Sequence, residues 1–64
     1  MTAKQYVYKF NADTGVSYTI VASRYEQARS HFKKVVTAGY IVTYAGRYIG
    51  PAVRNGSCVS VVSN

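Results

Sequence analysis

Acidic residues are almost missing from this chain. Its 64 residues include only two carboxylates, Asp13 and Glu26, and a single histidine, His31. General acid–base catalysis and the binding of hard metal ions both draw on Asp, Glu and His side chains. We therefore expect no catalytic residues, no metal site and no cofactor, and we expect a binding protein rather than an enzyme.

Cysteines and long apolar stretches are also scarce. The one cysteine, Cys58, cannot form an internal disulfide, whereas a secreted domain of this size usually relies on several. No stretch approaches the roughly 18 apolar residues that a membrane span requires, and the first residues lack the apolar segment of a signal peptide. These absences predict a cytoplasmic protein without a membrane partner.

Basic and aromatic residues, by contrast, are plentiful. Eight Lys or Arg residues give a formal net charge of +6, and seven tyrosines are present. Because 48% of the residues are hydrophobic, a folded unit is more plausible than a disordered tail. A chain of this length forms one small domain, here residues 1–64. Its charge predicts that the partner is nucleic acid or an acidic protein.

The first half of the chain predicts a hairpin followed by a helix. Apolar and polar residues alternate over residues 4–10 and 16–22, and the intervening Asn, Asp and Gly residues favour a turn. Ser23 and Glu26 have the spacing of a capping box. The apolar residues of the helix form one stripe, namely Tyr25, Ala28, Phe32, Val35 and Val36. The helix is expected from about residue 24 to 38, with Gly39 as its C-terminal stop.

The second half predicts further strands. Residues 40–45 are β-branched and aromatic, which favours a strand. A short fourth strand is expected around residues 47–53, Asn55 and Gly56 are typical of a type I′ hairpin turn, and a last strand is expected over residues 58–62. The fold class is therefore α+β, with a small antiparallel sheet of four or five strands and one helix on one face, in the order ββαβ plus a C-terminal hairpin.

A helix of this length covers only one face of such a sheet, and the register of the third strand decides what the open face presents. If Tyr40 and Tyr44 point outward, the open face offers two aromatic rings beside Lys9 on which bases can stack. If Ile41 and Thr43 point outward, the open face is a β-branched surface suited to another sheet or subunit. The sequence leaves both arrangements open.

Two functions therefore remain, and neither is enzymatic. The first is binding of nucleic acid through cations and tyrosines. The second is a protein-binding module, such as a phage-encoded or mobile-element accessory or inhibitor that docks on an acidic host protein, or an assembly or capsid accessory. A homodimer through the open sheet face is also compatible with the pattern. The residues expected to contact nucleic acid are Lys9, Arg24, Arg29, His31, Lys33, Lys34, Tyr40 and Tyr44.

Overall fold

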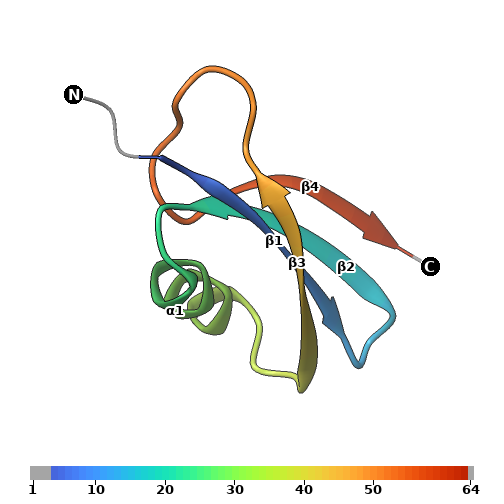
Figure 1. Cartoon of the computed structure of the whole chain (residues 1–64). Helices are drawn as coiled ribbons and strands as arrows, with labels where there is room; N and C mark the ends of the chain where they lie inside the picture. Colours follow the sequence, from blue (N-terminus) through green and yellow to red (C-terminus); the bar gives the residue numbers. More distant parts are fainter. Residues whose placement is uncertain (1–3, 64) are drawn as a thin grey trace.

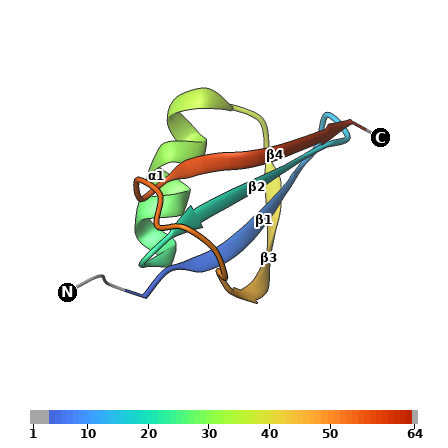
Figure 2. The same ribbon diagram turned by 90° about the horizontal axis from the view of Figure 1, so that it is seen from above.

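The computed structural model describes residues 4–63, which form one antiparallel sheet with a single helix on one side (Figure 1). The sheet has four strands in the order β3-β1-β2-β4, and Figure 2 shows their twist. This arrangement confirms the α+β class that the sequence predicts. In chain order the elements are β1 (Tyr6–Ala12), β2 (Val16–Ala22), α1 (Tyr25–Val35), β3 (Tyr40–Arg47) and β4 (Ser57–Ser63).

The hydrophobic core lies between α1 and the two central strands. Phe10 of β1 is fully buried and Phe32 of α1 is 1% exposed, and their rings stack with centroids 4.6 Å apart. The other core residues on this side are small or branched, which lets the helix approach the sheet closely. They are Ala12, Ile20, Ala22 and Ala28.

The pairing of β3 with β1 settles which way the β3 side chains point. Phe10 lies opposite Val42, and Tyr8 lies opposite Tyr44. Directly opposite residues of antiparallel strands share a face, so Tyr40 and Tyr44 point to the side of the helix. The arrangement with these two tyrosines on the open face is wrong, because Tyr40 and Val42 instead fill space beside the core. Ile41 and Thr43 point outward.

The helix begins where the sequence predicts, but its predicted capping residues and its predicted C-terminal end are wrong. The N-cap is Arg24, whose N–H donates to the Gln27 side chain at 3.2 Å; Ser23 has another partner, described below. The helix ends at Val35. Gly39 lacks the positive φ of a helix stop, and it lies so close to the β1–β2 turn that an added Cβ would collide with the Asp13 carboxylate.

The segment between β3 and β4 does not form the predicted fourth strand. Of residues 47–53, only Arg47 belongs to a strand, as the last residue of β3. Residues 48–56 cross from the β3 edge of the sheet to the β4 edge (Figure 2). Asn55 and Gly56 do form a turn, in which the Ser57 N–H donates to the Arg54 carbonyl at 3.0 Å. It is not type I′, because only Gly56 has positive φ, and the strand that follows pairs with β2 instead of folding back on residues 47–53.

A group of side chains that we call the polar clasp fastens this crossing segment to the start of the sheet. The Gln5 Nε2 donates to the Val53 carbonyl at 2.6 Å and to the Asn55 Oδ1 at 2.9 Å. The same Asn55 oxygen accepts from the N–H and the hydroxyl of Ser23, both at 3.1 Å. Val21, on the face opposite α1, is fully buried at this end of the sheet, where the crossing segment replaces a helix as the cover.

Candidate nucleic-acid interface

Beyond the edge of the helix, the side of the sheet that carries α1 presents a cluster of aromatic rings. Ring centroids lie 5.7 Å apart for Tyr8 and Tyr44, 6.1 Å for Tyr6 and Tyr44, and 5.8 Å for Tyr8 and Tyr25. Alternation along β1 and β3 brings these rings to one face, and α1 adds one from its first turn. We call this cluster the tyrosine surface; its members are Tyr6, Tyr8, Tyr25, Tyr40 and Tyr44.

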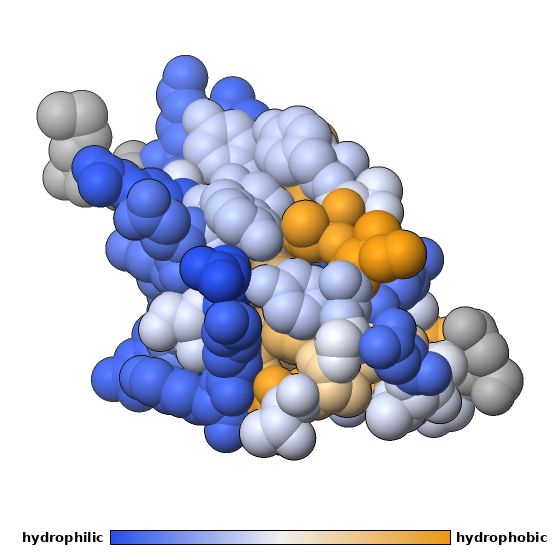
Figure 3. Space-filling model, turned by 90° about the horizontal axis from the view of Figure 1, so that it is seen from below, coloured by the Kyte–Doolittle hydropathy of each residue, from blue (hydrophilic) through white to orange (hydrophobic). Residues whose placement is uncertain are grey.

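The rings of the tyrosine surface are accessible to solvent. Tyr44 is 59% and Tyr25 is 38% exposed, and the other three are half-buried. Neighbouring rings are tilted by 45° to 58°, so they do not stack flat on one another. In Figure 3, pale aromatic rings form a band across this face, with deep-blue polar side chains beside it. The surface therefore offers ring faces that a planar group can contact.

Cations flank the tyrosine surface. The Arg29 Nε donates to the Tyr40 hydroxyl at 3.0 Å. Lys33 follows Arg29 by one helical turn and lies on the same side of α1. At the other end, Arg47 lies opposite Tyr6 and so shares the face of the tyrosines. All three cations are exposed, and the tyrosine surface includes neither of the two acidic residues.

The pKa values of the tyrosines reflect these neighbours. The hydrogen bond from Arg29 lowers the pKa of Tyr40, and the charges of Arg29 and Lys33 act in the same direction. Burial raises the pKa of Tyr8, with a further contribution from Tyr44, and burial is also the main cause of the raised pKa of Tyr25. The cations are thus close enough to Tyr40 to favour a negative charge there, and a phosphate group would meet the same field.

The structure brings together four of the eight predicted contact residues, namely Arg29, Lys33, Tyr40 and Tyr44. It separates Lys9, His31 and Lys34 from them. Lys9 lies opposite Thr19 and Thr43 and therefore points to the open face of the sheet. Arg24 precedes the helix as its N-cap.

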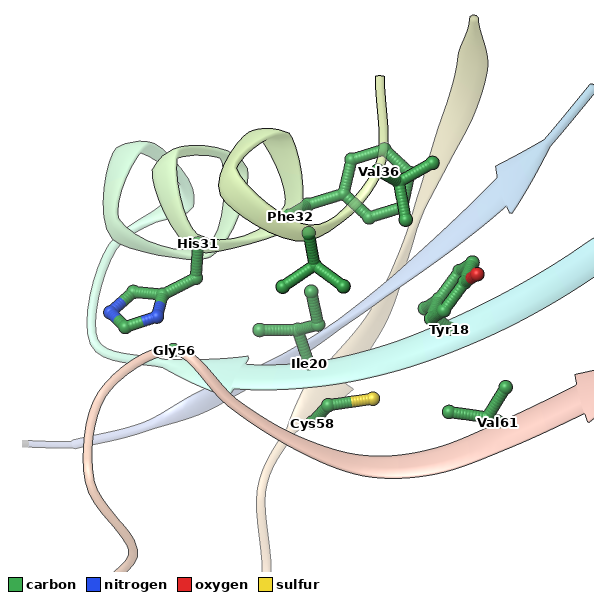
Figure 4. Close-up of a pocket in the computed structure, with 9 residues that line it drawn as sticks. Tyr18, Ile20, His31, Phe32, Val36, Gly56, Cys58 and Val61 are labelled. Atoms are coloured by element: carbon green, nitrogen blue, oxygen red, sulfur yellow. The ribbon is translucent and has the colours of Figure 1, made fainter. Parts of the chain in front are cut away.

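The remaining two predicted residues lie elsewhere on α1. Lys34 comes two positions after the buried Phe32, which at about 100° per residue turns it away from the core and toward solvent. The His31 ring lies over Gly56, on the side of α1 that faces β4 (Figure 4). His31 and Lys34, two of the predicted contact residues, therefore lie apart from the tyrosines.

The sequence reasoning missed four members of this interface, namely Tyr6, Tyr8, Tyr25 and Arg47. Tyr6 and Tyr8 lie in the alternating pattern of residues 4–10. The helix has 11 residues, about 16 Å in length, and contacts mainly β1 and β2, so it leaves the β3 side uncovered. The alternation of tyrosines in β1 and the shortness of the helix were signals of this site.

A second concave feature lies on the other side of the helix, between α1 and β4 (Figure 4). This α1–β4 groove has a volume of about 220 Å³ and is lined mostly by apolar side chains. Val35 and Val61, at 78% and 57% exposed, form part of its wall. None of the residues that line the groove is Asp, Glu, Lys or Arg, so its chemistry differs from that of the tyrosine surface.

Metal-ligand clusters, membrane-spanning helices and similar proteins give no further information about the function of this chain. Within residues 4–63 no three His, Cys, Asp or Glu side chains come together as metal ligands. No helix in that part of the chain is both long and apolar enough to cross a membrane. Comparison of the chain with models of protein families, with curated proteins and with solved structures finds no match.

Proposed function

We propose that this protein is a non-enzymatic module that binds single-stranded nucleic acid on the tyrosine surface. The observation that carries the proposal is the combination of exposed tyrosine rings with Arg29, Lys33 and Arg47 on one face. Bases stack on aromatic side chains with about 1–3 kcal/mol per base, and the cations attract phosphates. Unstacked bases are needed for such contacts, so a single strand suits this face better than a duplex.

The overall charge supports the same partner. A net charge of +6 attracts any polyanion and speeds its encounter with the protein. Asp13 sits in the β1–β2 turn and Glu26 in the first turn of α1, where a carboxylate favours the helix N-terminus. Cys58 is free and exposed, which suits the reducing cytoplasm, where such a partner is present.

Fluorescence anisotropy with short unstructured oligonucleotides tests the proposal. We expect the single strand to bind more tightly than the matching duplex. Three phosphate contacts correspond to a slope of about −2 in log affinity against log salt for a single strand. Tyr44→Ala should weaken binding by about tenfold, in line with the loss of one stacked base. Tyr48→Ala is the matched control, because Tyr48 lies on the crossing segment outside the tyrosine surface.

Two adjacent lysines provide the sharpest comparison. Lys33→Glu and Lys34→Glu change the charge equally, yet Lys33 flanks the tyrosines and Lys34 points away. We expect Lys33→Glu to reduce the salt dependence by about one unit and to weaken binding much more than Lys34→Glu. Equal effects of the two substitutions would show that only net charge matters and would contradict this site. Absence of binding by the unmodified protein at low salt would overturn the nucleic-acid function and favour a protein partner.

A further inference from the structure

The exposed edge of β4 carries the inference that we draw beyond nucleic-acid binding. Residues 58–63 are all exposed, and β4 contains no charged side chain and no proline. Val59, Val61 and Val62 are each between 47% and 57% exposed. Edge strands of soluble proteins are usually protected by charge, proline or a covering segment. The one device present here is a bulge at Val59, between the pairs of Ser60 with Thr19 and Cys58 with Ile20.

We propose that β4 pairs with β4 of a second copy of this chain, which joins two four-stranded sheets into one. The bulge breaks the side-chain alternation at Val59, so the regular part of the edge begins at Ser60. An antiparallel pair centred on Val61 places the two Val61 side chains opposite each other and sets Ser60 opposite Val62 of the second copy. Each of these pairs then joins side chains on the same face of the sheet.

The distribution of charge leaves β4 as the exposed strand through which two copies can meet. Every copy carries +6, so most approaches of two copies bring like charges together. The only strands without a charged side chain are β2 and β4, and β2 is an interior strand. The open face, by contrast, would bring two Lys9 side chains together. An acidic protein would find no cation on β4, so the edge suits a neutral, apolar partner surface.

The α1–β4 groove supports the same partner. Val61 belongs to the wall of this groove and, in the proposed pairing, also lies at the two-fold axis. A two-fold axis through an antiparallel pair runs perpendicular to the sheet and keeps both helices on one side. The grooves of the two copies therefore open toward the same axis. Association would remove exposed valines from water, a gain that a domain of this small size otherwise lacks.

Sedimentation equilibrium from micromolar to millimolar concentration tests the dimer. We expect a monomer–dimer equilibrium that tightens with salt, because salt screens the repulsion between two basic copies. Nucleic-acid binding weakens with salt, so the two proposals fail or succeed separately. Val61→Lys should weaken the dimer by at least about tenfold, since like charges would meet at the axis. Ile41→Lys adds the same charge on the other edge strand, where Ile41 is 72% exposed, and should leave the dimer intact.

Cross-linking gives a second readout that does not depend on a destabilising charge. Replacement of Cys58 by Ser together with Val61→Cys should produce a disulfide-linked dimer under mild oxidation, because the two Val61 positions face each other in the proposed pair. Cys58→Ser with Ile41→Cys should remain unlinked. A monomer at all concentrations, equal effects of the two lysine substitutions, or equal cross-linking at both edges would overturn the proposal.

Discussion

At the scale of single residues, Gly56 occupies the most constrained position in the described structure. Its φ is +91°, and an added Cβ would enter the space of the His31 ring. The two constraints have different origins, because the first belongs to the backbone and the second to a neighbouring side chain. A substitution at Gly56 therefore lowers the free energy of unfolding in two ways, through backbone strain and through steric overlap, and the two contributions can be measured separately.

Gly56→Ala should destabilise the protein by about 1–3 kcal/mol through positive φ and steric overlap. His31→Ala in the same background removes the obstructing ring and should restore part of the lost stability. The cost of positive φ at position 56 should remain. Urea unfolding of the two single variants and the double variant forms a double-mutant cycle. Strict additivity would show that the His31 ring does not oppose the new methyl group.

Phe32 is the centre of the aromatic core. It stacks on Phe10 and meets Tyr18 and Tyr40 edge-on, with centroids at 5.4 and 4.8 Å. Phe32→Ala should lower the free energy of unfolding by about 3–5 kcal/mol, a loss that a small domain hardly tolerates. Val35→Ala, on the same helix but 78% exposed, should change the urea midpoint little. Similar midpoints for both variants would contradict the orientation of α1.

Tyr40 should ionise before Tyr8 and Tyr25 as the pH rises. Its pKa is lowered by the Arg29 hydrogen bond, whereas burial raises the pKa of Tyr8 and of Tyr25. Ultraviolet titration of tyrosinate checks this order, with Tyr40→Phe, Tyr8→Phe and Tyr25→Phe to assign the three steps. Arg29→Gln should move the Tyr40 step to higher pH. A Tyr40 step at higher pH than the steps of Tyr8 and Tyr25 would refute the assignment.

At the scale of secondary structure, the polar clasp has taken the place of the predicted helix cap. Asn55→Ala removes the acceptor of three hydrogen bonds from Gln5 and Ser23 and should cost about 1–3 kcal/mol of stability, because it leaves donors without a partner. Asn55→Asp keeps an acceptor oxygen and should cost less. Thermal unfolding measures both, and equal losses would show that the Asn55 oxygen is not the important atom.

Local sequence patterns predict the elements whose structure depends on residues close together in the chain. The alternation in residues 16–22 predicts β2 with its observed bounds. The helical periodicity predicts the buried Ala28 and Phe32 but is wrong for Val35, which is exposed. The turn at Asn55 and Gly56 was also visible. The pairing partner of the strand after this turn could not be predicted, because that strand could pair with residues 47–53 or with the free edge of β2. Only the assembled sheet decides between such distant partners.

At the scale of the whole molecule, the candidate site also depends on how strands that are distant in the sequence pair with each other. Composition indicated cations and tyrosines, but the helical periodicity grouped Lys34 with Arg24 and His31 and did not group Arg29 with Lys33. Whether Tyr44 joins Arg29 and Lys33 depends on the register of β3 against β1, which has two solutions of opposite outcome. The gathering of Tyr6, Tyr25 and Tyr44 on one face is therefore a property of the sheet and not of any one segment.

The polar clasp also constrains how the protein is made. Gln5 bonds to residues 48 and 50 positions later in the chain, and β2 receives its outer neighbour only when β4 arrives. During synthesis from the N-terminus, the β1–β2 hairpin and the helix are therefore complete while Val21 is still uncovered and one edge of β2 is unpaired. A nascent chain stalled before residue 53 presents an open sheet edge to its surroundings. The arrival of β4, and not the formation of the helix, is the event that completes this fold.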